Sequence, residues 1–388
     1  MADASDVQSR LAAVARDFGR DRSARQLRRE LDAEDYRRLA DAGFLLTGVP
    51  AEMGGLWVNT QTSTRPVCEI LRVLAKGDAS VALVSSMHPA VLSLWLCPIE
   101  VPEPYASAWR DQRAQVAGAA KDGCWWGTIT SEPGTGGDVF KTRASAKRGN
   151  NGEFLISGQK HFGSGSGVTS YMITTAVPQG EDAADWFFMD VRGRTWDGSS
   201  GIRLASEWDG HGMIATQSHA FDFTDFPATR IAWPGNLRTL AGLAGAVISS
   251  AFTAVVVGVT QSAFESAREQ IFKRRDSLRS FEQVEWARVE NEAWLIEQAY
   301  EGMQKAVEAE GSGALLEVLH AKTAIAELAE SLTGRLCRVI GGGTFHRGSP
   351  FGWAFEDVRA LGFLRPPWGL AFDSILERTW ERLDGRQA

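Results

Sequence analysis

Cysteine is scarce in this sequence. The four cysteines among 388 residues are Cys68, Cys97, Cys124 and Cys337, with no C-x-x-C pair and no nearby histidine to complete a metal-binding motif. This spacing excludes the common zinc sites, so we predict no metal. Isolated thiols in so long a chain are typical of a reducing compartment, so we expect a cytoplasmic protein.

An excess of positive charge is also missing. The chain has 41 Lys and Arg against 48 Asp and Glu, which gives a formal net charge of -7. Nucleic acids are bound by clustered basic residues, so this balance argues against a nucleic-acid partner. A small anionic substrate, which needs only a few local basic residues, stays open. Residues 1–18 mix charged and apolar side chains without the apolar core of a signal peptide, so nothing indicates export.

Long hydrophobic runs are rare, with one exception. Residues 239–264 carry no charged side chain, and this length is enough to cross a bilayer. The run is rich in Ala, Gly and Ser and continues directly into a strongly charged stretch, residues 265–279. A helix that is buried on all sides of a bundle has the same composition. We therefore predict a buried helix and, because we find no second hydrophobic segment, no membrane protein.

The residue pattern changes character twice along the chain. A chain of 388 residues exceeds the roughly 250–300 residues at which one hydrophobic core stops growing, so we expect several domains. We predict an α+β fold with an N-terminal α-helical domain at 1–121, a central β domain at 122–233 and a C-terminal helical bundle at 234–388. The predicted helices cover residues 7–18, 33–42, 67–75, 79–96, 106–120, 240–273, 281–311 and 315–340 and a last one from about 370; the predicted strands cover 125–130, 154–157, 171–177, 186–191 and 220–226.

Five short motifs occur in one order along the chain. They are P-A-E-M-G-G at 50–55, T-I-T-S-E-P-G-T-G-G-D at 128–138, S-G-Q-K-H-F-G-S at 157–164, W-D-G-H-G-M-I-A-T-Q-S at 208–218, and Gly341–Gly342 followed by E-D-V-R at 356–359. Together they resemble the signatures of the acyl-CoA dehydrogenase superfamily over nearly the whole chain. The resemblance implies an N-terminal helical domain, a central β domain, a C-terminal four-helix bundle and a bound FAD.

The resemblance also implies where the flavin ring lies. An isoalloxazine needs apolar walls and a few polar groups around its edge, and two strands that end in small hydroxyl residues can supply them. By resemblance, Thr128, Thr130 and Ser131 meet the pyrimidine side, Ser164 reaches N5, and Phe162 packs on the ring where the family usually has Trp.

Other cofactor residues are implied to come from a neighbouring subunit. The usual Arg at the FAD diphosphate corresponds to Arg274 or Arg275, and the bare backbone of Gly341 and Gly342 can approach phosphates. This sharing implies a homodimer, usually doubled to a homotetramer. A solvated loop is the plainer interpretation of the nearby His346. For His161, next to Phe162 on a strand, alternation predicts a structural side chain that points away from the flavin.

The usual catalytic base of an acyl-CoA dehydrogenase is missing. Removing the α-proton needs a carboxylate, and the family's Glu position falls on or beside Arg365, in a loop at 361–369 without any acid. The alternative base region at 237–243 has none either. The first hypothesis is nevertheless an FAD-dependent oxidoreductase that oxidises a CH-CH group with a relocated base and passes electrons to an electron-transfer flavoprotein. Arg365 is then a candidate anchor for a substrate carboxylate or phosphate, with a surface salt bridge as the plainer alternative.

Two further hypotheses stay open. The alternative is a two-component monooxygenase that acts on an aromatic, heteroaromatic or amine substrate, uses FAD or FMN and receives reduced flavin from a flavin reductase. Such an enzyme needs no α-proton base, and Ser131, Ser164 and His88 are donors of a suitable type near the ring. Trp368 then lines the pocket of an aromatic substrate, although the loop lacks the His that these monooxygenases usually carry there. The third hypothesis is a catalytically inactive flavoprotein subunit.

Overall fold

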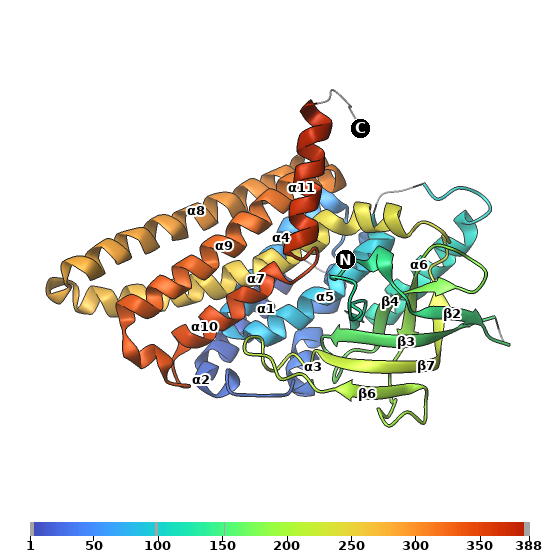
Figure 1. The fold of residues 1–388 in the computed structure, drawn as a ribbon, viewed down its shortest axis with the longest axis horizontal. Coiled ribbons are helices and arrows are strands. Elements are labelled where there is room, and N and C mark those ends of the chain that lie inside the picture. Colours follow the sequence, from blue (N-terminus) through green and yellow to red (C-terminus); the bar gives the residue numbers. More distant parts are fainter. Residues whose placement is uncertain (1–3, 98–99, 151, 384–388) are drawn as a thin grey trace.

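The computed structural model describes residues 4–97, 100–150 and 152–383, and Figure 1 shows their arrangement. The first region is helical, as predicted. Its helices are α1 (Ala4–Arg20), α2 (Arg22–Arg25), α3 (Ala33–Asp41), α4 (Thr60–Gly77), α5 (Ala79–Leu96) and α6 (Ala106–Lys121), with the short 3-10 turns η1 (Phe44–Gly48) and η2 (Ala51–Met53). Asp78 separates α4 from α5 and caps the second helix, because its side chain accepts a hydrogen bond from the backbone N–H of Val81.

The central region is a sheet of seven strands. They are β1 (Trp126–Thr128), β2 (Ser145–Arg148), β3 (Phe154–Gly163), β4 (Tyr171–Pro178), β5 (Asp185–Asp190), β6 (Ile202–Ser206) and β7 (His219–Arg230), with η3 (Val139–Lys141) before β2. The strand order is β1-β4-β2-β3-β7-β5, and β4 also pairs with β5, which closes five strands into a ring. Strands β2 and β6, which are short and largely exposed, were not predicted, and β3 is longer than predicted.

A bulge explains why three phenylalanines of β7 only partly alternate. Phe223 pairs with Gly158, and Phe226 pairs with Ile156, so β7 advances three residues where β3 advances two. Asp225 has a left-handed backbone at φ 51 and takes up the extra residue. Phe221, Phe223 and Phe226 consequently all point into the core of the sheet.

The last region contains the long helices α7 (Leu237–Lys273), α8 (Ser280–Glu310) and α9 (Leu315–Ile340), then α10 (Pro350–Val358) and α11 (Trp368–Leu383). Short 3-10 turns connect them: η4 (Arg275–Ser277), η5 (Gly311–Ala314), η6 (Gly342–Phe345) and η7 (Arg359–Gly362). The predicted bundle helices are confirmed to within a few residues at each end. In Figure 1, α7, α8 and α9 run alongside one another, and α11 leaves the body of the molecule.

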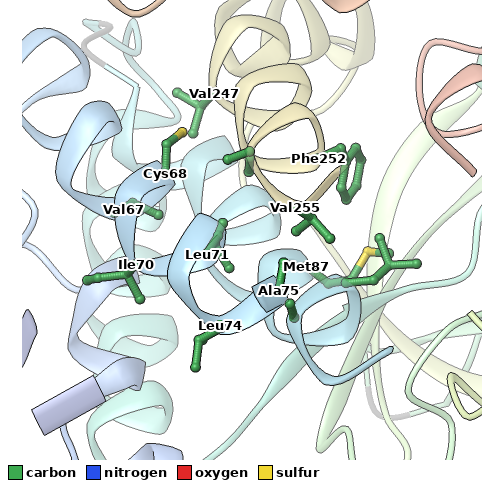
Figure 2. Close-up of a cluster of buried hydrophobic side chains, with 14 of the residues drawn as sticks. Val67, Cys68, Ile70, Leu71, Leu74, Ala75, Met87, Val247, Phe252 and Val255 are labelled. Atoms are coloured by element: carbon green, nitrogen blue, oxygen red, sulfur yellow. The ribbon is translucent and has the colours of Figure 1, made fainter. Parts of the chain in front are cut away.

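One hydrophobic core joins the regions. Figure 2 shows side chains of α4, such as Val67, Leu71 and Ala75, beside Val247 and Val255 of α7, with Met87 of α5 close by. The same cluster includes residues of the β region, among them Trp126 and Phe188. Because the core runs through all three regions, it does not mark where one domain ends and the next begins. The predicted domain boundaries at 121/122 and 233/234 therefore stay a prediction.

The absence of a second hydrophobic segment was a wrong inference. Both Ala79–Leu96 and Leu237–Lys273 are long and apolar enough to cross a membrane by length and composition. In the folded chain, however, 89% and 72% of their most apolar windows are buried inside the protein. Packing against the other helices therefore accounts for their composition, as predicted for the second of them.

Candidate flavin site

A buried ion pair fixes the loop that carries the first motif. The Lys160 ammonium of β3 donates to Glu132 Oε1 at 2.6 Å, to Thr142 Oγ1 at 3.0 Å and to the Thr175 carbonyl at 2.6 Å. Both charged side chains are almost fully buried. Glu132 also accepts the backbone N–H groups of Arg143 and Ala144, at 2.7 and 3.2 Å. Because Glu132 belongs to the first motif and Lys160 to the second, the pair ties the two motifs together.

Burial acts on the two charges in opposite ways. It lowers the pKa of Lys160 to about 8, although the carboxylate of Glu132 opposes this shift. Burial alone raises the pKa of Glu132, but the attraction and hydrogen bonds of Lys160 outweigh it and hold that pKa below its usual value. This pair was not predicted from the sequence, although a lysine and a glutamate inside two motif segments whose only other charged side chain is Asp138 are a recognisable signal.

The structure brings the ends of the two motifs together. Thr128 ends β1, Thr130 is buried, and the Ser131 carbonyl accepts the His161 backbone N–H at 2.8 Å. The Ser131 hydroxyl is only partly buried. These three predicted pyrimidine-side residues therefore lie in one segment, directly beside the strand that carries Phe162.

Phe162 presents its ring on the surface of the sheet. A bulge lies between Lys160 and Gly163, and Phe162 has a left-handed backbone at φ 59. The side chain is 56% exposed, and its ring meets Trp208 edge-on with centroids 6.1 Å apart. The rings of His161 and Phe162 also lie 6.1 Å apart, because the bulge interrupts the alternation that placed them on opposite faces. That His161 points away from the flavin stays a prediction.

Ser164 begins a chain of hydroxyl groups. Its Oγ lies 2.8 Å from Ser218 Oγ, which in turn lies 2.7 Å from Thr216 Oγ1. The backbone N–H of Gly165 also donates to the Thr216 carbonyl at 2.8 Å. Ser164 and Ser218 are both buried. The second motif is therefore joined to the 208–218 motif by side chains and by backbone.

The 208–218 loop is in turn fastened to α10. The Met213 backbone N–H donates to Asp357 Oδ1 at 2.6 Å. A side chain at Gly212 would collide with the Glu356 carbonyl, so only glycine allows the loop to come this close. Burial raises the pKa of Asp357 to about 7, against the opposing effect of the Met213 N–H. The sequence motifs at 208–218 and 356–359 thus form one contact.

Arg365 binds the loop of the first motif, residues 128–138, which we call the flavin-motif loop. It forms no surface salt bridge. Its Nη1 donates to the Gly137 carbonyl at 2.6 Å and its Nη2 to Ser131 Oγ at 3.2 Å. Burial lowers the pKa of Arg365 to about 10, although the nearby Asp138 opposes this shift. The segment that carries it is held by Lys322 of α9, a buried side chain that donates to the carbonyls of Leu361 at 3.0 Å and Pro366 at 2.9 Å.

His88 has a structural position. Its Nδ1 accepts the Trp126 backbone N–H at 3.3 Å, and its Nε2 lies 3.0 Å from the Leu45 carbonyl, to which it donates. The ring is fully buried, and burial lowers the pKa of His88 to about 4. Both ring nitrogens are thus already bound by main chain, which favours a structural role, and the catalytic role of His88 stays a prediction.

The remaining predicted cofactor residues lie elsewhere. Arg274 follows the end of α7, pairs with Glu282 at 2.9 Å and donates to the Val339 carbonyl, just before Gly341 and Gly342. In Figure 1 the α7–α8 turn lies at the end of the bundle away from the sheet. Side chains at Gly341 and Gly342 would meet nothing within 4 Å. Within one chain the predicted cofactor residues therefore form two separate groups. The first group lies at the sheet and consists of Thr128, Thr130, Ser131, Phe162 and Ser164. The second group lies at the far end of the bundle and consists of Arg274, Gly341 and Gly342.

A cleft of about 1030 Å³ opens beside the second group. Residues of α9, η6 and α10 and the loop at 209–214 line it, including Arg335, Arg338, His346, Arg347 and Glu356. The cleft contains neither Ser131 nor Phe162 in its wall. His346 Nδ1 accepts the Gly348 backbone N–H at 3.0 Å, as in an ordinary loop turn.

Trp368, predicted to line a substrate pocket, stacks on Phe372 with centroids 5.6 Å apart. Within the residues that the structure describes, no group of three or more His, Cys, Asp or Glu is placed to hold a metal ion.

Comparisons with known proteins agree with this architecture. The chain is 24% identical over 250 residues to a dibenzothiophene monooxygenase of Mycolicibacterium goodii. This match covers 61% of this chain and 55% of that protein. The chain is 25% identical over 351 residues to an L-evernosamine nitrososynthase of a Micromonospora species, covering 86% and 80%. The crystal structure of FMN-bound TdsC from Paenibacillus sp. A11-2 matches with a TM-score of 0.77 and 17% identity, covering 98% of each chain. No known family profile matches the chain.

The helical, β and helical regions, with flavin-motif loops between sheet and bundle, define an acyl-CoA dehydrogenase fold. These relatives and structural neighbours belong to the acyl-CoA dehydrogenase-like flavoprotein superfamily, whose signatures the motifs of this chain resemble.

Proposed function

We propose that this protein is a flavin-dependent monooxygenase that takes reduced flavin from a separate reductase and oxygenates a small organic substrate. The observation that carries the proposal is the position of Arg365. The segment that supplies a carboxylate base in acyl-CoA dehydrogenases here places a guanidinium against Ser131 and Gly137. The relatives named as a monooxygenase and a nitrososynthase favour this alternative over the dehydrogenase hypothesis.

The carboxylates nearest to this loop are already occupied. Glu132 is bound by Lys160 and by two backbone N–H groups. Asp138 caps η3 by accepting the Phe140 N–H at 2.9 Å, and it lies 3.6 Å from the Lys141 ammonium. Arg365 itself remains protonated at neutral pH, since its lowered pKa is still about 10. Both carboxylates thus already have donors or a cation beside them, which argues against their use as the base for the α-proton of an acyl thioester.

The residues of the sheet fit a flavin ring. Phe162 offers an exposed aromatic surface, and Thr128, Ser131 and Ser164 place small hydroxyl groups on the adjoining segments. When bound and reduced, the flavin supplies the two electrons for oxygen activation. Phe162 would stack on the ring, and Ser131 and Ser164 would orient its polar edge. FMN is the proposed form, because the TdsC structure holds FMN, and FAD is the alternative.

A homodimer is part of this proposal. Arg274 and the Gly341–Gly342 turn lie together, but they belong to the end of the bundle away from the sheet. In a two-fold dimer this second group of one protomer could reach the phosphate of a flavin bound to the sheet of its partner. Each site would then require two chains.

The test compares the two chemistries directly. The purified protein is loaded with FMN or FAD and titrated under anaerobic conditions with acyl-CoA thioesters of several lengths; we expect no bleaching. The same protein is then supplied with a flavin reductase, NADH and labelled oxygen in the presence of sulfide, indole and amine probes. We expect incorporation of one labelled oxygen atom into at least one probe. Anaerobic bleaching by an acyl-CoA would instead establish a dehydrogenase.

A further inference from the structure

Three cations lie around the flavin-motif loop: Lys160 and Lys322 are buried and Arg365 is partly buried, and only Lys160 is neutralised by a carboxylate. Lys160 is paired with Glu132 at 2.6 Å. Lys322 and Arg365 donate to backbone carbonyls or to a hydroxyl group, and neither forms an ion pair with a carboxylate among the residues that the structure describes. A buried cation without a partner is costly, so a site that retains one is suited to an anion.

The position of Arg365 is fixed from both sides. On the bundle side, Lys322 ties down the Leu361 and Pro366 carbonyls, which flank Arg365 in the sequence. On the sheet side, Pro367 packs on Gly137, where an added Cβ would lie 3.0 Å from the proline ring. The guanidinium is therefore held in place before any ligand arrives, which is the arrangement expected of an electrostatic site.

The charges that face Arg365 come from few elements. Asp138, at the start of η3, is the acid that acts on it, and Lys160 of β3 is the nearby cation, already balanced by Glu132. The Asp138 carboxylate also accepts a hydrogen bond from the Phe140 backbone N–H and lies near the Lys141 ammonium. The balance at the loop is thus positive, and it is centred on the guanidinium that touches Ser131.

We propose that Arg365 is the charge partner of reduced flavin, so that this protein binds the reduced cofactor more tightly than the oxidised one. The inference rests on the proposed function, in which the ring lies on Ser131 and Phe162. Oxidised flavin is neutral, and the addition of two electrons and one proton, delivered by the separate reductase, gives an anion with its charge on the pyrimidine ring. A fixed positive charge at that edge selects the form that carries the electrons.

The experiment measures the dissociation constants of oxidised and reduced FMN, under anaerobic conditions, for the wild type, Arg365→Gln and Arg365→Lys. For Arg365→Gln we expect reduced FMN to weaken about tenfold more than oxidised FMN, and the midpoint potential of bound FMN to fall by about 30 mV, the equivalent for a two-electron couple. Arg365→Lys keeps the charge and should keep most of the preference. The control Arg192→Gln removes an exposed cation of the same region, paired with Asp190, and should change neither constant.

A second variant carries the test if Arg365→Gln does not fold. Asp138→Asn keeps the cap of η3 and removes the acid that opposes Arg365, so the preference for reduced FMN should increase. Equal weakening of both forms in Arg365→Gln, or an unchanged ratio in Asp138→Asn, overturns the inference alone and leaves Arg365 a structural role. A wild type that binds neither FMN nor FAD overturns the proposed function, and the inference falls with it.

Discussion

At the scale of single residues, the site depends on side chains that hold other groups in place. Glu132 and Lys160 fasten the Ser131 loop to β3, Lys322 fastens the Arg365 segment to α9, and His88 connects α5 to β1 and η1. None of these four needs to touch a flavin to matter for its binding. Because these side chains are buried, substituting any one of them should lower the stability of the protein.

Breaking the ion pair on one side should destabilise the whole protein. We expect Lys160→Met to cost about 3–5 kcal/mol of unfolding free energy, because Glu132 is left charged and buried. Urea unfolding followed by circular dichroism measures the change. The double variant Lys160→Met with Glu132→Leu should be more stable than Lys160→Met alone, and a double variant that is less stable would contradict this account of the pair.

His88 should make stability depend on pH. Its folded pKa of about 4 lies below the unfolded value of about 6.5, so the unfolded state binds more protons between these values. Its contribution is fully present above pH 6.5 and is lost as the pH falls towards 4, on the order of 3 kcal/mol. Urea titrations across this range should show a shallower loss for His88→Gln than for the wild type. Identical slopes would mean that the histidine is not held neutral.

At the scale of elements, loops rather than helices bring the motifs into contact. The 208–218 loop reaches the second motif through Ser218 and reaches α10 through Met213. The 361–367 segment reaches the first motif through Arg365 and Pro367. The long helices and the closed sheet provide fixed ends for these loops.

Gly212 tests the contact between the 208–218 loop and α10. Gly212→Ala should lower the unfolding free energy by about 1–3 kcal/mol, since the new methyl group meets the backbone of Glu356 and displaces the Met213 N–H from Asp357. The matched control is Gly302→Ala on α8, where a methyl group meets nothing within 4 Å; it should be neutral or stabilising, by up to about 1 kcal/mol. Thermal unfolding measures the stability of both variants. A larger loss of stability for Gly302→Ala than for Gly212→Ala would contradict the argument.

At the scale of the whole molecule, the separation of the predicted cofactor residues into two groups supports the proposed homodimer. The sheet carries Ser131, Phe162 and Ser164, whereas Arg274 lies with the Gly341 turn at the far end of the bundle. A closed two-fold dimer can unite such groups twice, once at each site.

Mixed dimers test this arrangement. Phe162→Ala and Arg274→Ala should each weaken FMN binding, since one loses the stacking surface and the other a cation at the phosphate. Random dimers of the two variants should recover tight binding at about a quarter of their sites, because half the dimers are mixed and each contains one intact site. Fluorescence titration of FMN measures the fraction. Arg268→Ala, an exposed arginine of α7 paired with Glu290, is the control; no recovery would place the whole site within one chain.

Much of the architecture could be predicted from the sequence, because it is encoded locally. Apolar periodicity located α5 and the three long bundle helices to within a few residues, since a helix needs only its own buried face to be recognised. Short exposed strands such as β2 and β6 lack that signal and were missed. The bulge at Phe162 was also missed, because a strand pattern by itself does not show where an extra residue interrupts the alternation.

The site shows the same division. The sequence by itself determined the fold class, the flavin-motif loops and the absence of a carboxylate between residues 361 and 369, because residue types at short spacing carry that information. Only the tertiary structure decided that His88 is bound by main chain, that Glu132 pairs with Lys160, and that Arg365 reaches Ser131 across 234 positions. The reason is that buried charges and polar groups must find partners, and those partners come from whichever segment the fold brings alongside.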